Sequence, residues 1–527
     1  MNSTIGDEVV NNQVMVQLMV QLMAWSQRYD TITRTAVSYH HFLGSVYCHS
    51  VMIRTYGCQM NVNDTQIAST ILLNSGYHLV DDINQAEIVL LMTCAIRENA
   101  EIKVWKKLHE LSAMKTDGRL RQIGLLGCIA ERLKTEILAK HESIDVIAGP
   151  DSYRDLPKLL AINRLTAQNA VNVLLSFDET YANIMPTISK SSVSAFVSIM
   201  RGCDNMCSYC IVPFTRGRER SRAIESIVDE VRQLSGSGIK EITLLGQNVN
   251  SYRDLSHHKS GESSVSLVPG FKTVYKPRSG GLTFDVLLDE VARVDPNMRI
   301  RFTSPHPKDF DERVLHVIQR HHNICKCIHL PVQSGSNHVL ARMRRGYTRE
   351  AYLSLVERIR QIIPNCALTS DFICGFCGET EAEHNQTVDL MSRVKYSTAY
   401  TFAYSMRRKT HAFHTLTDDV PQEVKIARLN QIHQLYREIA LKENRSLIGE
   451  QQLILIEGDS KKSADELYGR NEANLKVIVP KVDIPVSSGD TTSLRPMAPG
   501  DYVLARIDNC SAITLMATPI SHQMLSN

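Results

Sequence analysis

AFVSIMRGCDNMCSYC, residues 195–210, is the most informative stretch of the chain, because an apolar run leads directly into three closely spaced cysteines. Cys203, Cys207 and Cys210 are separated by three and then two residues, and no fourth cysteine lies nearby. An iron–sulfur cube normally takes four thiolates, so three leave one iron open to a reactive ligand. A structural zinc site closes with four Cys or His ligands instead. The spacing therefore favours a cluster with an open iron over zinc.

The bulk composition is that of a multidomain globular protein. At 527 residues the chain is too long for one hydrophobic core, and roughly two to four domains are expected. The net charge of +3 neither demands nor excludes a nucleic-acid partner. The 13 cysteines are odd in number and form no secreted-domain framework. This usage indicates a reducing compartment, in which thiolates bind metals.

The first 48 residues form a segment that we leave unassigned. VQLM occurs twice, at 16–19 and 20–23, but the apolar stretch is too short and too interrupted to span a bilayer. Early Asp7 and Glu8 and few arginines make it a poor mitochondrial transit peptide. An amphipathic helix and a start-site artefact both stay open.

Residues 49–160 alternate apolar runs with helical stretches, which predicts a parallel sheet of βαβ units. The runs are SVMIRTY, EIVLLMT, QIGLLG and SIDVIAG, ending at 56, 93, 127 and 149, with helices at 65–76 and 99–115. Cys58, Cys94 and Cys128 follow the first three runs. Because parallel strands share one carboxyl edge, we expect these thiols to meet there and hold a second cluster. The alternative is three ordinary buried cysteines.

After a linker at 161–192, residues 193–447 give a second series of strands and helices. The expected strands are 195–201, 241–248, 299–305, 326–332, 367–376 and 399–405. Six such repeats predict an open (β/α)6 barrel with function at the carboxyl ends of its strands. Polar side chains there suit a ribose, a carboxylate or an ammonium group, although each could be a simple turn residue. They are Gln247, Asn248, Ser304, Ser334 and Asp371.

Three other features of this region carry alternatives. The polar stretch 253–280 reads as a surface insertion. Cys374 and Cys377 form a CGFC, but a thioredoxin-like redox motif should open a helix after the first strand of its domain. Cys325 and Cys327 alternate along a strand and so face opposite sides.

The carboxy-terminal part predicts a connecting helix at 422–444 and a small β-barrel within 448–519, followed by a tail at 520–527. The expected strands are 451–458, 475–480, 501–507 and 512–518. Basic residues near the barrel mouth favour phosphate contacts over plain solvated surface, whereas those of the small β-barrel also fit the usual role of surface lysines in keeping a protein soluble. The predicted RNA contacts are Arg216, Arg218, Arg344, Arg345, Arg407, Arg408, Lys461 and Lys462.

Taken together, these motifs resemble the methylthiotransferase family of radical S-adenosylmethionine (SAM) enzymes, over about residues 49–519. The resemblance to the branch acting on isopentenyl-adenosine in tRNA rests on TYGCQMNVNDT (55–65), RGCDNMCSYCIVPFTRGRERSR (201–222), LLGQNVNSY (244–252) and GRNEANLKV (469–477). Four further stretches resemble the eukaryotic mitochondrial-type members of this branch: RFTSPHPKDF (301–310), MRRGYTREAY (343–352), GFCGET (375–380) and FAYSMRRKT (402–410). One departure is Cys377, where bacterial members commonly have proline.

The resemblance implies an α/β protein with a flavodoxin-like first domain, an open radical SAM barrel and a carboxy-terminal RNA-binding domain called TRAM. The 203/207/210 trio would hold the cluster that cleaves SAM, whose adenosyl radical takes hydrogen from C2 of the modified adenine. The polar barrel-mouth residues named above would bind that SAM. The 58/94/128 trio would hold an auxiliary cluster carrying a sulfur that a second SAM methylates. Two [4Fe-4S] clusters and SAM are therefore the implied cofactors of a sulfur-inserting transferase.

The implied partners are a tRNA anticodon loop, modified at position 37, an electron-donor protein and a kinase regulatory subunit, without a membrane. The implied location is mitochondrial, with the cytoplasm as alternative. Three other functions stay open: methylthiolation of threonylcarbamoyl-adenosine in tRNA, modification of a ribosomal-protein aspartate, and kinase-binding regulation beside or instead of catalysis. The motif TYGCQMN disfavours the first two.

Overall fold

The computed structural model describes residues 49–96, 98–139, 141–189, 191–256, 270–271, 280–487 and 489–526. Segment 1–48 and most of the predicted insertion at 253–280 lie outside the described residues. The chain divides into two compact units. Of the described residues, the first unit comprises 49–56, Ala68–Thr93 and Ile102–Leu174, and the second comprises Gly57–Ile67, Cys94–Glu101 and those from Leu175 onward. Among the described residues, no helix is both long and apolar enough to cross a membrane.

A six-stranded, fully parallel sheet forms the centre of the first unit. Its strands are β1 (Ser50–Thr55), β2 (His78–Leu79), β3 (Ile88–Thr93), β4 (Gln122–Gly127), β5 (Val146–Ala148) and β6 (Ala170–Asn172). Their order, β2-β1-β3-β4-β5-β6, is the flavodoxin-like order extended by one strand. Strands β3 and β4 are buried along their whole length, as aliphatic runs in a sheet covered on both faces are. The predicted parallel sheet is confirmed, but β2 and β6 were not predicted, and β6 lies inside the stretch 161–192 that was predicted as a linker.

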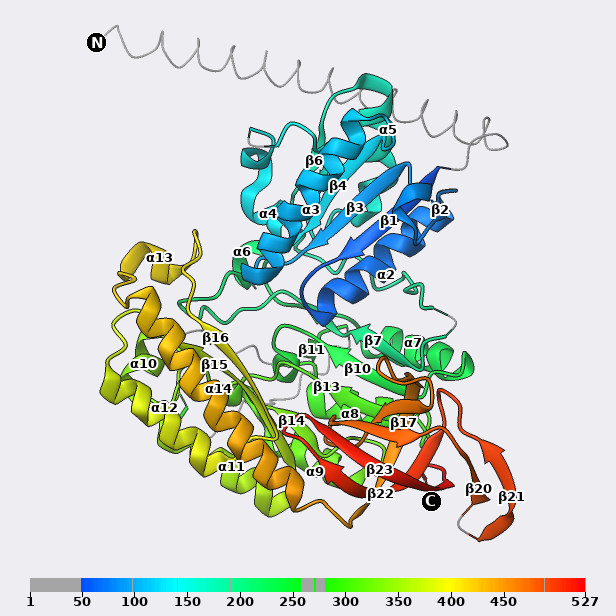
Figure 1. Cartoon of the computed structure of the whole chain (residues 1–527). Helices are drawn as coiled ribbons and strands as arrows, with labels where there is room; N and C mark the ends of the chain where they lie inside the picture. The colour runs from blue at the N-terminus through cyan, green and yellow to red at the C-terminus, as the bar shows by residue number, and fades with distance from the viewer. Residues whose placement is uncertain are drawn as a thin grey trace, which may run out of the picture. The chain divides into compact units, whose positions relative to one another are not determined.

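The helices of this region follow the strands in sequence and flank the sheet (Figure 1). They are α2 (Gln59–Asn74), α3 (Glu98–Thr116), α4 (Cys128–Leu133) and α5 (Leu156–Thr166). Helix α4 begins at the residue directly after β4, without a connecting loop. A cysteine at that position is therefore fixed by the strand and by the helix.

In the second unit, six parallel strands follow one another in space in the order in which they occur in the chain. They are β7 (Ser194–Ser198), β10 (Glu241–Leu245), β13 (Arg299–Phe302), β14 (Cys327–His329), β15 (Ala367–Cys374) and β16 (Thr398–Ala403). A parallel bridge between Ile300 and Ile324 joins the first three strands to the last three. This is the predicted six-stranded α/β barrel.

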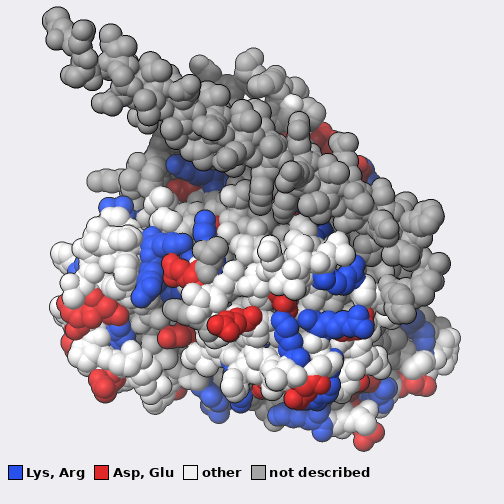
Figure 2. Space-filling model, turned by 90° about the horizontal axis from the view of Figure 1, so that it is seen from above, with Lys and Arg blue, Asp and Glu red and all other residues white. Residues whose placement is uncertain are grey.

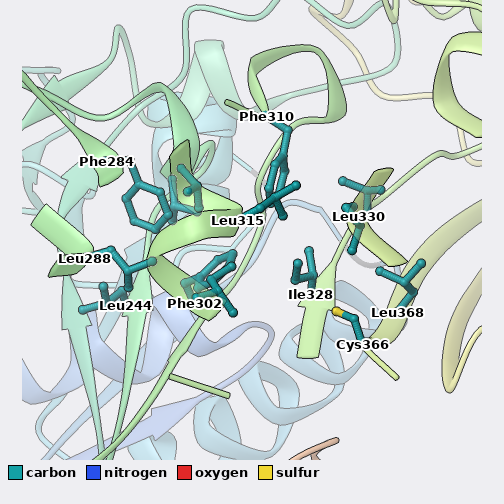
Figure 3. Close-up of a cluster of buried hydrophobic side chains, with 14 of the residues drawn as sticks. Leu244, Phe284, Leu288, Phe302, Phe310, Leu315, Ile328, Leu330, Cys366 and Leu368 are labelled. Carbon is teal, nitrogen blue, oxygen red and sulfur yellow. The ribbon is translucent and has the colours of Figure 1, made fainter. Parts of the chain in front are cut away.

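The barrel helices cover the outer faces of these strands with apolar side chains. The largest are α7 (Ile224–Gly236), α8 (Phe284–Ala292), α9 (Glu312–Arg320), α11 (Arg349–Ile362) and α12 (Glu381–Val394). Figure 3 shows the core between strands and helices, in which the rings of Phe284 and Phe302 lie edge to face with centroids 5.4 Å apart. Helix α12 starts with a capping box, because Thr380 accepts from the backbone of Glu383 while Glu383 accepts from the backbone of Thr380.

Beyond helix α14 (Gln422–Arg445), the chain closes a small barrel in the strand order β17-β18-β19-β23-β22. These strands are β17 (Gln451–Asp459), β18 (Glu466–Arg470), β19 (Lys476–Pro480), β22 (Tyr502–Cys510) and β23 (Thr514–His522). The small barrel predicted from the sequence is confirmed. The prediction did not include β18 or the hairpin of β20 (Asp483–Ser487) and β21 (Asp490–Pro496).

The turn between β18 and β19 docks onto the amino-terminal ends of the six-stranded barrel. Arg301 donates to the carbonyls of Asn471 and Glu472, both at 2.8 Å, while its Nε pairs with Glu241 at 2.9 Å. Arg299 likewise donates to the carbonyl of Arg470 at 3.0 Å. Buried guanidinium groups that satisfy backbone carbonyls on another element hold the two barrels together.

Candidate metal centres

The first cysteine trio lies on a loop bracketed by two short antiparallel strands, β8 (Met200–Arg201) and β9 (Arg220–Ser221), just after β7. Gly202 starts this loop with φ +76°, and a Cβ there would lie 2.0 Å from the carbonyl oxygen of Arg218. Only glycine permits that approach. The backbone of Cys203 then donates to the carbonyl of Gly217 at 3.2 Å. The loop is thereby held closed at its base.

A second anchor fixes the middle of the loop. Ser208 donates through its backbone to Met343 at 3.0 Å and through its hydroxyl to the carbonyl of Arg342 at 2.7 Å. Cys203 and Cys207 are buried, and Cys210 is half-buried. The loop is therefore a preformed cradle of thiols on the carboxyl side of the first barrel strand.

The electrostatics of these thiols suit a metal cluster. Burial raises the pKa of Cys203 well above its usual range, and repulsion from Cys210 and Cys207 adds to this. Burial raises the pKa of Cys210 to about 12, again with a contribution from Cys207. Buried, mutually repelling thiols become thiolates when a metal cation compensates their charge.

A single-ion site is not built by the described residues, since no three His, Cys, Asp or Glu side chains among them converge on one point. An iron–sulfur cube takes one thiolate per iron, so its ligands surround a volume and need not converge. The donor set of three thiols on one loop fits such a cube, and it does not fit a closed zinc site.

A buried ion network links this loop to helix α2, within the second unit. The carboxylate of Asp64 receives hydrogen bonds from Arg201 at 2.8 Å and from Arg216 at 2.7 Å. In the sequence, Arg201 precedes the cysteine trio and Arg216 follows it. The side chains of Asp64, Arg201 and Arg216 are essentially inaccessible to solvent. Burial opposes ionisation of Asp64, but Arg216 and Arg201 together hold its pKa below the usual range. Sequence reasoning missed this network, because Arg201 and Asp64 are 137 residues apart.

Two cysteines of the second trio are neighbours in the second unit. Gly57 has φ +110°, and a Cβ there would lie 2.2 Å from the Cβ of Cys94, so glycine allows the turn carrying Cys58 to approach Cys94. The hydrogen bond with Cys94 is the main reason that the pKa of Cys58 falls to about 6, despite opposing burial. A thiol with a lowered pKa is a ready metal ligand.

Cys128 lies in the first unit, as the first residue of α4. Strands β3 and β4 pair with Thr93 opposite Gly127. In the sequence, Cys94 directly follows Thr93 and Cys128 directly follows Gly127. A shared cluster for all three cysteines stays a prediction.

The predicted SAM residues differ in how far their side chains are already engaged. Asn248 donates to Asp309 at 2.8 Å and accepts from the backbone of His306 at 3.0 Å, which orders the loop after β13. Ser334 is fully buried and hydrogen-bonds Thr387 at 3.3 Å. These two residues shape the barrel mouth from inside the protein.

Three other polar positions near the barrel mouth fit a ligand better. The buried Oε1 of Gln247 has no hydrogen-bond partner in the described part of the chain, so it can accept one from a bound molecule. Ser304 adopts φ +63°, a strained conformation of the kind that gathers at ligand sites. Asp371 is half-buried and lies 3.5 Å from Nε2 of His329.

The predicted RNA contacts separate into buried and accessible groups. Arg216 and Arg345 are buried and bind other parts of the protein, so we no longer place them on an RNA surface. Arg407 pairs with Glu101 at 3.3 Å. The remaining positions are exposed: Arg218, Arg344, Arg408, Lys461 and Lys462. Figure 2 shows one face of the molecule, on which basic and acidic side chains are interspersed.

The CGFC cysteines are not set up for redox exchange. Cys374 and Cys377 are both buried free thiols. Burial raises the pKa of Cys374 to about 12 and also raises the pKa of Cys377. Because the thiolate is the reactive form, neither side chain is suited to disulfide exchange.

Comparison with known proteins assigns both regions that hold these sites. Residues 50–149 match the model of an uncharacterized protein family, UPF0004, and residues 197–391 match the radical SAM superfamily. A solved structure of the radical SAM methyltransferase TsrM from Kitasatospora setae aligns with a TM-score of 0.48 at 15% identity, covering 68% of this chain and 74% of that one.

Relatives with assigned names are much closer. The mitochondrial tRNA methylthiotransferase CDK5RAP1 of Mus musculus is 58% identical over 471 residues, covering 88% of this chain and 80% of the relative. The tRNA-2-methylthio-N(6)-dimethylallyladenosine synthase of Chloroherpeton thalassium is 44% identical over 470 residues, covering 89% and 96%. Identity at this level over nearly the whole chain settles the family: the protein is a member of the radical SAM tRNA methylthiotransferases.

Proposed function

We propose that this protein converts N6-isopentenyladenosine at position 37 of tRNA to its 2-methylthio derivative, using SAM and two [4Fe-4S] clusters. The observation that carries the proposal is where the cysteines fall. The two regions that match family models contain Cys58, Cys94 and Cys128 in one case and the 203/207/210 trio in the other. The name of the Chloroherpeton thalassium relative, tRNA-2-methylthio-N(6)-dimethylallyladenosine synthase, supports the isopentenyl substrate.

The chain's own residues bind and orient the reactants. The cradle of Cys203, Cys207 and Cys210 would hold the first cluster, which when bound supplies the electron that splits the sulfonium of SAM. Gln247 offers an unused acceptor to SAM near the barrel mouth. The clamp of Asp64 on Arg201 and Arg216 would keep the cradle in place and so hold the cluster in a fixed position.

The tRNA would be held through its phosphates by the exposed basic positions Arg218, Arg344, Arg408, Lys461 and Lys462, together with Arg407. Such contacts are electrostatic and weaken steeply with salt. The names of the CDK5RAP1 relatives support a mitochondrial location. An electron-donor protein and a kinase regulatory subunit complete the proposed partners.

Nucleoside mass spectrometry of tRNA from cells lacking the gene tests the function. We expect 2-methylthio-isopentenyl-adenosine to disappear while isopentenyl-adenosine accumulates. An unchanged level would refute the proposal, and loss of the threonylcarbamoyl derivative instead would favour the alternative substrate. Anaerobically purified protein should contain about eight irons per chain if both trios hold four-iron clusters.

A further inference from the structure

Arg345 is a buried cation that lies against the cysteine cradle. Its side chain is 3% exposed. Nη1 donates to Sγ of Cys207 at 3.4 Å and to the hydroxyl of Tyr209 at 3.4 Å. Nε donates to the hydroxyl of Tyr347 at 3.1 Å, and Nη2 donates to the carbonyl of Pro331 at 2.5 Å. The guanidinium also lies over the Tyr347 ring, 5.5 Å from its centroid. The group is therefore held by contacts from three separate segments of the chain.

No carboxylate compensates this charge within the described residues, because none of their ion pairs involves Arg345. Two other buried arginines do have a carboxylate partner, since Arg222 pairs with Glu230 at 2.6 Å and Arg301 pairs with Glu241 at 2.9 Å. Among the residues that the structure describes, Arg299 donates only to backbone carbonyls, but none of its hydrogen bonds reaches a cysteine. In the described part of the chain, the hydrogen-bond partners of Arg345 are hydroxyls, a backbone carbonyl and a cysteine sulfur. A buried charge is costly unless an opposite charge offsets it.

The cysteine cradle can supply that opposite charge. A cube ligated by three thiolates is anionic, and reduction makes it more so. We propose, on the basis of the iron–sulfur function argued above, that Arg345 is the built-in counter-ion of the cluster held by the first trio, acting through its hydrogen bond to Cys207.

Two consequences follow from this placement. A fixed cation and an N–H···S hydrogen bond favour the reduced cluster, so Arg345 raises the reduction potential of the centre that must deliver the electron. The cation and the cluster also stabilise each other, so the guanidinium favours folding when the cluster is bound and opposes folding when it is absent. A merely structural arginine would have neither property.

The test uses full-length protein, purified anaerobically, with R345M and R345K. R301M is the matched control, because Arg301 is also buried, at 8% exposed, but pairs with Glu241 at the opposite end of the barrel strands. Iron content is measured first. The midpoint potential is then followed by EPR in a Cys94→Ala background, which leaves the first cluster as the sole signal. Thermal unfolding is recorded with and without the cluster.

We expect R345M to make the midpoint potential more negative, with R345K in between because it keeps the charge and loses the planar fork. R345M should lower the Tm of the loaded protein and leave the Tm of the cluster-free protein unchanged or higher. R301M should lower both Tm values and leave the potential where it was.

An unchanged potential in R345M, or an equal loss of Tm in both forms, would overturn the proposal. If R345M fails to fold even without the cluster, the counter-ion role is likewise refuted, since that role predicts no loss in the cluster-free protein. Absence of iron from the wild-type protein is a different result, because it would refute the proposed cluster itself.

Discussion

Replacing Asp64 by Asn probes the clamp that holds the first cysteine loop. The substitution keeps the size of the side chain and removes the charge that receives Arg201 at 2.8 Å and Arg216 at 2.7 Å. Breaking a buried ion pair on one side costs about 3–5 kcal/mol, because the partner charge stays buried and uncompensated. Glu179, 3.7 Å from Nε of Arg201, offsets part of the loss for one arginine, which favours the lower end of that range.

Asp229→Asn is the matched control. Asp229 accepts from Arg232 at the same distance of 2.7 Å, but both side chains are more than 60% exposed. An exposed pair contributes only about 0.2–1 kcal/mol, because water screens the charges. The two variants thus make the same chemical change and differ mainly in burial.

Hydrogen exchange of the loop is the assay, because a chain with two units need not unfold in one step. Every 1.4 kcal/mol is tenfold in an equilibrium constant, so D64N should speed exchange across residues 201–216 by roughly a hundredfold or more. D229N should change exchange in α7 by no more than about fivefold. If the two variants gave equal, small effects, the clamp would not hold the loop.

The pH dependence gives a second check on Asp64. Its folded pKa is lowered, so its stabilising effect is fully present above the unfolded pKa of about 3.9 and is lost as the pH falls through the folded value. The difference between wild type and D64N should therefore be constant near neutral pH and shrink in acid. A difference that grew in acid would contradict the assigned charge.

The remaining predictions concern the cysteines and their turn. Cys207→Ala should remove about four irons per chain and abolish SAM cleavage, measured as 5′-deoxyadenosine release; cleavage that persisted would refute the cradle. Cys94→Ala should also lose about four irons but keep SAM cleavage, with no methylthio transfer to tRNA by mass spectrometry. Gly57→Ala should cost at least about 1 kcal/mol, because its φ is positive and the added Cβ would lie 2.2 Å from the Cβ of Cys94. The iron content of the Gly57→Ala variant should fall toward that of Cys94→Ala. A normal iron content would contradict the close approach of the Gly57 turn to Cys94.

Much of the fold could be predicted because local patterns determine it. The aliphatic runs that form β3, β4 and β10 could be predicted as buried strands because their residues are mostly apolar. Strand β18, with the sequence ELYGR, was missed because its polar letters resemble a loop. Its pairing with β17 and β19 is a tertiary effect, which local propensity does not encode.

The site was harder to predict where neighbours in sequence have opposite environments. Arg344 and Arg345 are adjacent in MRRGYTR, yet the first is exposed and the second is buried against Cys207. Arg216 likewise reads as surface charge until its distant partner Asp64 is known. Residue type and spacing identified the thiols, whereas ion-pair partners depend on which segments the fold brings together.

The docking of the β18–β19 turn has a practical consequence for experiments on RNA recognition. Deleting the chain after α14 would remove the carbonyls of Arg470, Asn471 and Glu472. The buried guanidinium groups of Arg299 and Arg301 would then lose these hydrogen-bond acceptors. If such a truncated protein lost activity, the cause could be damage to the six-stranded barrel or loss of tRNA contacts, and the experiment would not distinguish the two. Charge reversal at the exposed Lys461 and Lys462 leaves that seam intact, and so isolates the contribution of the small barrel to substrate capture.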